Sequence, residues 1–104
     1  MHKQTKLTNI PKQVKTAVWL RDGRRCISCG LRVGIESACS HVVRRSRGGL
    51  GIEQNVVTHC FECHRLYDSF DEWTVRKTLE YIERKYPGWN PDRVKYTKYG
   101  KNQY

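Results

Sequence analysis

The sequence predicts a small α+β domain that is held together by a bound metal ion. The chain has 104 residues, of which only 38% are hydrophobic, so its apolar core is marginal without an additional cross-link. Two C-x-x-C pairs, Cys26/Cys29 and Cys60/Cys63, supply one. Segments with helical spacing alternate with two short strand-like runs. The length fits one domain, which we divide into a flexible N-terminus (1–10), a folded domain with its C-terminal helix (11–89) and a basic aromatic tail (90–104).

The cysteine pairs are interpreted as a zinc site. The N-terminus lacks the apolar run of a secretion signal and no stretch is long enough to span a membrane, so we expect a cytoplasmic protein with reduced thiols. Four thiolates satisfy a tetrahedral structural Zn²⁺ and leave no open position. The alternative is two pairs of buried or redox-active thiols, which would need a thioredoxin-like context that the sequence lacks. The fifth cysteine, Cys39, is expected to be a buried strand residue.

Three helices are predicted from apolar spacing and helix-stop signals. The first begins after Pro11 and ends near Asp22-Gly23. The second runs from Cys63 to about Phe70. The third, from Glu72 to Tyr86, ends at Pro87-Gly88 and has apolar residues near helical spacing at Trp73, Val75, Leu79, Ile82 and Tyr86.

Two strands are predicted between the cysteine pairs. Residues 39–43 have a strand-like pattern that contains His41, and residues 55–58 form a β-branched run suited to a return strand. Residues 44–54 contain three glycines and almost no apolar residues, so they form a loop.

The charge of the chain indicates a polyanionic partner. Twenty Lys and Arg against ten Asp and Glu give a net charge of +10, and nucleic acid is the commonest partner of so basic a small domain. A basic protein without such a partner is the alternative. An anionic membrane surface is disfavoured, because no basic amphipathic helix stands out.

Residues 14–70 resemble the HNH nuclease family, especially its small zinc-knuckle members from bacteriophages. The resemblance rests on R-D-G-R-R-C-I-S-C-G, H-V-V-R-R-S-R-G-G, N-V-V-T and the final C-x-x-C-H. It implies a ββα-metal fold, in which a hairpin is followed by a helix. It also implies that the protein cleaves DNA. A phage-encoded member would act in the cytoplasm of the infected host cell.

The resemblance implies a role for each residue of the motif. His41 corresponds to the general base that deprotonates the attacking water, a task suited to a neutral imidazole. Asn55 corresponds to the middle Asn, whose amide would bind the loop backbone and hold His41. His64 corresponds to a ligand of the catalytic metal, although it could instead cap the zinc knuckle. Asp68 lies four residues later on the same helical face and would complete the metal site. Ser40 stands where many members carry Asp or His, and its hydroxyl is a weak ligand.

The implied reaction is hydrolysis of a phosphodiester bond with one divalent ion, Mg²⁺, Mn²⁺ or another, to give a 5′-phosphate and a 3′-hydroxyl. Phosphate contacts are expected from basic residues near the motif: Arg44, Arg45, Arg47 and Arg65. His59 is expected to be a strand residue. The alternatives are a non-catalytic zinc-knuckle module that binds nucleic acid, and a nuclease active only with a partner such as phage terminase or packaging proteins. Both a monomer and a homodimer fit the sequence.

Overall fold

The computed structural model describes residues 3–97, with side chains from residue 6 onward, and confirms an α+β protein. Four α-helices, two strands and four 3-10 turns follow one another along the chain: α1 (Lys3–Thr8), α2 (Lys12–Arg21), η1 (Ile35–Ser37), β1 (Ser40–His41), η2 (Arg45–Arg47), η3 (Glu53–Asn55), β2 (Val56–Val57), α3 (Phe61–Asp68), α4 (Glu72–Lys85) and η4 (Pro91–Arg93). Within this described part, no helix is long and apolar enough to cross a membrane.

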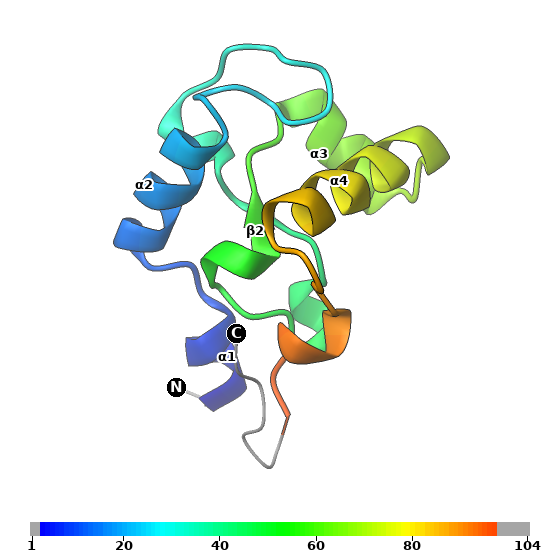
Figure 1. The fold of residues 1–104 in the computed structure, drawn as a ribbon. Coiled ribbons are helices and arrows are strands. Elements are labelled where there is room, and N and C mark those ends of the chain that lie inside the picture. Colours follow the sequence, from blue (N-terminus) through cyan, green and yellow to red (C-terminus); the bar gives the residue numbers. More distant parts are fainter. Residues whose placement is uncertain (1–2, 98–104) are drawn as a thin grey trace.

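The two strands form a small antiparallel sheet at the centre of the molecule. Ser40 pairs with Val57 and His41 with Val56. In Figure 1, β2 lies between α2 on one side and α4 on the other, and α1 lies at the end of the molecule opposite α3.

The sheet divides the core into two small clusters, because successive side chains of a strand point to opposite faces. Val56 packs with Val18 of α2 and with Ala38. Val57 packs on the other side in a cluster that includes Ile82 of α4, together with Val42, Trp89 and Val94. Neither cluster is large, so the two sides of the sheet depend on further connections between them.

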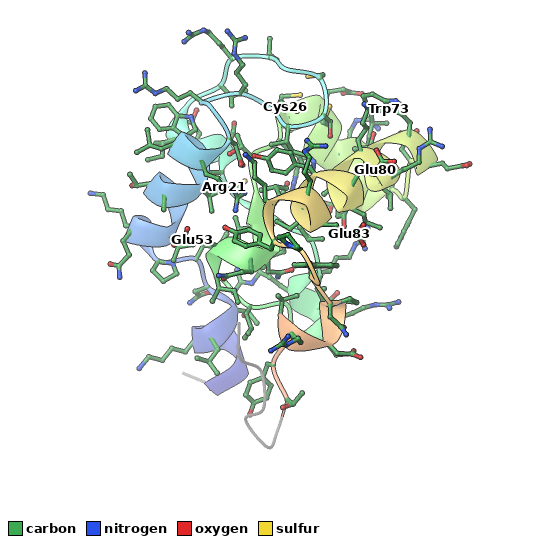
Figure 2. All side chains as sticks on the ribbon, in the orientation of Figure 1. Arg21, Cys26, Glu53, Trp73, Glu80 and Glu83 are labelled. Carbon is green, nitrogen blue, oxygen red and sulfur yellow. The ribbon has the colours of Figure 1, made fainter. Side chains whose placement is uncertain are left out.

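One such connection is a polar network at the end of α2. Arg21 donates to the Val56 carbonyl at 2.8 Å and to the Tyr86 hydroxyl at 3.2 Å. Its guanidinium also binds the carboxylate of Asp22 through both oxygens, at 2.7 and 3.1 Å. In Figure 2, Arg21 lies between α2 and the helix α4, so this side chain links the two halves of the core.

The strands are shorter than predicted, for a reason that lies in Asn55. The Val42 N–H still donates to the Asn55 carbonyl at 2.8 Å, but the next N–H, that of Val43, donates to the Asn55 side chain. The backbone ladder therefore ends where an amide side chain replaces a backbone partner. Within the predicted ranges 39–43 and 55–58, only Ser40–His41 and Val56–Val57 form strand.

The loop between the strands packs closely against the backbone of the protein. A Cβ at Gly49 would lie 1.6 Å from the Val43 carbonyl oxygen, and one at Gly51 would lie 1.9 Å from the Asn9 carbonyl oxygen. Glycine is therefore required at both positions by close approach of backbone to backbone.

Both ends of the chain, as far as they are described, contain residues that are buried in the domain. The segment expected to be loose contains α1, and Thr8 is buried. The tail packs on the domain as far as it is described: Val94 is fully buried, and its carbonyl accepts from the Leu50 N–H at 2.8 Å. Lys98–Tyr104 lie outside the described residues.

Candidate functional site

The four cysteines of the two C-x-x-C pairs meet at one point. The Sγ atoms of Cys26, Cys29, Cys60 and Cys63 all lie within 4.8 Å of one another, and none of the five cysteines forms a disulfide. The Cys29 and Cys60 sulfurs are 3.7 Å apart. A tetrahedral zinc ion with Zn–S bonds of about 2.3 Å places its sulfurs about 3.8 Å apart. The cluster therefore has the dimensions of a structural zinc site.

Local backbone structure aims each pair of sulfurs inward. The first pair lies in a turn closed by the Gly30 N–H, which donates to the Cys26 carbonyl at 2.9 Å, with Gly30 at φ +80°. In the second pair, Cys60 is the N-cap of α3 and its sulfur accepts from the Cys63 N–H at 3.4 Å. The Ile27 N–H donates to the Thr58 carbonyl at 3.0 Å. That bond joins the first turn to the segment that leads into the second.

The cysteine cluster needs a cation to carry thiolates. Cys26, Cys60 and Cys63 are buried. Burial and the neighbouring sulfurs of Cys26 and Cys60 raise the pKa of the Cys63 thiol, because negative charges concentrated in an apolar site repel one another. A bound Zn²⁺ would remove that penalty, so these residues are positioned to hold a metal ion.

Beside the cluster lies an open cleft of about 730 Å³. It is bounded by the connection between α1 and α2, by β1 and the start of the loop, and by one face of α3. Its lining comprises Asn9, Ile10, Lys15, Cys39, His41, Arg44, Arg45, Ser46, His64 and Asp68. The cleft thus brings together, from two segments distant in sequence, five residues predicted as site residues: His41, Arg44, Arg45, His64 and Asp68.

His41 is held by the carbonyl of Thr8, at the end of α1. Its Nε2 lies 2.8 Å from that oxygen. A carbonyl can only accept, so Nε2 carries the hydrogen and Nδ1 of the neutral ring has the lone pair. Burial lowers the pKa of His41; the Thr8 carbonyl acts in the opposite direction, and Arg45 and His64 lower it further. The imidazole is therefore neutral at physiological pH and can accept a proton at Nδ1.

Asn55 is fully buried behind this cleft. Its Oδ1 accepts from the Val43 N–H at 2.8 Å, and its Nδ2 donates to the carbonyls of Val43 at 3.1 Å and Leu50 at 2.9 Å. The amide thus binds the chain two residues beyond His41 and joins it to the far end of the loop. Asn55 belongs to η3 and precedes β2, whereas we predicted that it opens the strand.

His64 and Asp68 face each other on α3. The His64 Nε2 and Asp68 Oδ2 atoms are 3.4 Å apart, and the two side chains are 38% and 55% exposed. Ligand atoms at about 2.1 Å from one metal ion lie roughly 3 to 3.5 Å apart when the ligands are adjacent. The pair therefore has a spacing suited to two ligands of one divalent ion, with the solvent side open.

Ser40 is buried and is not among the residues that line the cleft. Its hydroxyl lies in hydrogen-bond contact with His64 Nδ1 and 2.8 Å from Nδ1 of His59. The other ring nitrogen of His59, Nε2, is 3.0 Å from the Thr78 hydroxyl. The hydroxyl hydrogen and one of the two oxygen lone pairs of Ser40 are thereby used inside the protein. Its hydroxyl touches the back of His64 and is not a member of the open ligand pair.

The predicted phosphate-binding arginines lie in different surroundings. Arg45 is exposed at the cleft and donates to Asn9 Oδ1. Arg44 is half-buried: it donates to the Tyr67 carbonyl at 2.8 Å and its guanidinium lies 4.1 Å from the centroid of the Phe70 ring. Arg47 lies outside the cleft, near Lys95. Arg65 also lies outside it and pairs with Glu62.

Several residues of this region were not found by sequence reasoning. Lys15 and Asn9 line the cleft from the segment before the first cysteine pair. Cys39 also lines it and is only partly buried, whereas we expected a buried thiol. Thr78 was not predicted, because the pattern used for α4 consisted of apolar residues alone. The buried stripe of α4 is formed by Thr74, Thr78 and Ile82, at intervals of four. That interval is the signal that could have found it.

Comparison with known proteins gives no match: no family model, no curated protein and no solved structure is significantly similar to the chain.

Proposed function

We propose that the protein is a metal-dependent DNA endonuclease of the HNH type. The observation that carries this proposal is that His41, with a free Nδ1 lone pair, lines the same cleft as the His64/Asp68 pair. The order of two short antiparallel strands followed by α3 also supports a ββα-metal fold. The excess of ten positive charges suits a nucleic-acid substrate.

The proposed reaction is hydrolysis with a general base. His41 Nδ1 accepts a proton from water while the water oxygen forms a bond to phosphorus. The bond between phosphorus and the 3′ oxygen breaks, and that oxygen takes a proton from solvent. The products are a 5′-phosphate and a 3′-hydroxyl. Asn55 keeps the segment after His41 in place, and the Thr8 carbonyl keeps the ring oriented.

His64 Nε2 and Asp68 Oδ2 are the atoms that would hold a divalent cation. Bound there, the cation would neutralise phosphate charge and stabilise the leaving oxygen. The nitrogen and oxygen donors suit Mg²⁺ or Mn²⁺ better than the four-thiolate site does, so the two sites would take different metals.

A plasmid assay tests the proposal. Zinc-loaded protein is incubated with supercoiled DNA with and without Mg²⁺ or Mn²⁺, beside His41→Ala. We expect nicking by the wild type with divalent metal only, and a loss of at least about 100-fold in His41→Ala, because general-base catalysis contributes typically 10²–10⁴. The variant must retain zinc and bind DNA. DNA that stays equally intact with both proteins contradicts catalysis and favours a module that only binds nucleic acid. The assay is repeated with packaging proteins, because activity that depends on them would identify a nuclease with an obligatory partner.

Two arginines test where DNA lies. Arg45→Ala should weaken DNA binding and reduce the slope of log K against log salt by about 1, the contribution of one phosphate contact. Arg65→Ala is the matched control, because Arg65 lies outside the cleft and is paired with Glu62. Equal losses in the two variants, measured by fluorescence anisotropy over a salt series, would contradict DNA binding in the cleft.

A further inference from the structure

A continuous line of hydrogen bonds runs from the interior of α4 to the back of His64. It passes from the Thr74 carbonyl through the Thr78 hydroxyl, His59 and the Ser40 hydroxyl to His64 Nδ1. We propose that Thr78, His59 and Ser40 are positioning residues that fix His64 with its hydrogen on Nδ1, so that the Nε2 lone pair faces Asp68 and the divalent ion. As a statement about a metal ligand, this proposal rests on the proposed function.

The direction of the line is set at its buried end. The Thr78 hydroxyl lies 2.8 Å from the Thr74 carbonyl, and a carbonyl can only accept, so Thr78 donates its one hydrogen there. The Thr78 oxygen then accepts from the next member. That member is His59 Nε2, at 3.0 Å, which must therefore carry a hydrogen.

His59 transmits the direction because it is neutral. It is 2% exposed, and both of its ring nitrogens contact hydroxyl groups. Neither ring nitrogen therefore has a hydrogen bond to a carboxylate, which would be needed to offset the free-energy cost of burying a protonated His59. A neutral ring with hydrogen on Nε2 presents a lone pair at Nδ1. The Ser40 hydroxyl therefore donates to His59 Nδ1 across 2.8 Å.

The last bond fixes His64. Because the Ser40 hydrogen is given to His59, its oxygen must accept from His64 Nδ1, which lies in contact with it. His64 then has its hydrogen on Nδ1 and its lone pair on Nε2, the atom 3.4 Å from Asp68 Oδ2. A ligating histidine characteristically donates its other N–H to an acceptor, and loss of that acceptor typically lowers metal affinity 10- to 100-fold. Ser40 was predicted from the sequence to be a weak metal ligand. In this proposal it instead accepts a hydrogen bond from the metal ligand His64.

The test reads the proton position directly. In ¹⁵N-labelled, zinc-loaded protein near neutral pH, long-range ¹H–¹⁵N correlation distinguishes the two tautomers of each imidazole. We expect the hydrogen of His64 on Nδ1. In Thr78→Val the terminal acceptor is lost, the line can run in the opposite direction, and His64 should populate the Nε2–H form. Mn²⁺ affinity, measured by paramagnetic resonance of the free ion, should fall in the same variant. Ser40→Ala should reduce it about 10- to 100-fold.

The matched controls separate the hydrogen bond from packing. Thr58→Val makes the same substitution at another fully buried threonine, whose hydroxyl has no hydrogen-bond partner among the described residues. It should leave the His64 tautomer and Mn²⁺ affinity unchanged, and Thr78→Ser, which keeps the hydroxyl, should restore both. Hydrogen on Nε2 of His64 in the wild type, or identical behaviour of Thr78→Val and Thr58→Val, would overturn the proposal.

The plasmid assay is read independently of these measurements. The wild type could show the expected His64 tautomer, and Thr78→Val could change it, while the DNA stays intact. That result contradicts the proposed nuclease activity and supports the positioning role. A protein that cuts DNA while Thr78→Val behaves like Thr58→Val contradicts the positioning role and upholds the nuclease.

Discussion

At the scale of single residues, the protein concentrates its polar contacts on a few buried side chains. Asp22 is one of them: its carboxylate accepts from the Thr58 N–H at 2.9 Å and from the Tyr81 hydroxyl at 2.5 Å, in addition to Arg21. One side chain thus connects α2, the end of β2 and α4. An aspartate before a glycine was expected only to end a helix, because its partners are 36 and 59 residues away in sequence.

Asp22→Asn should destabilise the protein by about 3–5 kcal/mol, because it removes the negative charge that compensates the largely buried Arg21 and leaves that guanidinium without its counter-ion. The free energy of unfolding is measured by urea titration of zinc-loaded protein. Asp92→Asn is the control, since Asp92 pairs with Lys95 at the surface with 76% of its side chain exposed, where such pairs contribute little. Equal midpoints for the two variants would contradict the role of Asp22.

At the scale of elements, helix ends are well defined and strands are not. The start of α4 is marked by Asp71, whose Oδ2 accepts from the Thr74 N–H at 3.0 Å and from the Thr74 hydroxyl at 2.7 Å. Pro87-Gly88 follows its end as predicted. The carbonyl of the same Thr74 is the last acceptor in the line of hydrogen bonds from His64. The N-cap at Asp71 therefore also stabilises the turn of α4 that holds this acceptor.

Asp71→Ala should lower the melting temperature by a few degrees, because an N-cap acceptor is lost, whereas Asp71→Asn should stay close to the wild type. Hydrogen bonds from Thr74 lower the pKa of Asp71. The stabilisation is therefore fully present above the pKa of an unfolded Asp, about 4, and is lost only as pH falls through the lower folded value. The difference between Asp71→Ala and the wild type should accordingly be constant from about pH 5 to 8, measured by calorimetry. A difference that grows with pH in this range would contradict the assignment.

How far the elements follow from the sequence depends on the range of the interactions that form them. Helices α2, α3 and α4 could be predicted because local signals such as Pro11, apolar spacing and Pro87-Gly88 define them, whereas α1 lies in a segment that was predicted to be flexible. The site residues His41, His64 and Asp68 could be named from their motif and spacing. The strands could not be delimited, because Asn55 ends the ladder through a side chain 12 residues away. The contact of Thr8 with His41 and the line through His59 and Thr78 depend on tertiary packing, for which the sequence has no local pattern.

At the scale of the whole molecule, we expect stability to depend on the cysteine cluster. The apolar residues form two small clusters separated by the sheet, and the third cluster consists of Cys26, Cys60 and Cys63 with Val33 beside them. We therefore expect metal binding at these cysteines to contribute part of the folding free energy. The cluster also lies next to His59 and His64 in sequence, so its loss would disturb the cleft directly.

Removal of the metal with a chelator should therefore abolish cooperative unfolding and the native near-ultraviolet dichroism, and one equivalent of Zn²⁺ should restore both. Metal content is measured on reduced protein and should be about one tightly held ion per chain. A metal-free, reduced protein that keeps dispersed amide resonances would contradict this role of the cluster. Addition of Mg²⁺ instead of Zn²⁺ serves as the control, because hard cations do not favour thiolate ligands.

The bond from Thr8 to His41 has a consequence for the rotational freedom of a side chain. An imidazole that loses its only carbonyl contact can turn by half a revolution and exchange the places of its two nitrogens. In this protein the ring is prevented from doing so by a carbonyl 33 residues earlier in the chain, at the end of a helix of six residues. Any fusion or deletion that displaces α1 would thus leave every motif residue in place and still allow the ring of His41 to present the wrong nitrogen to water.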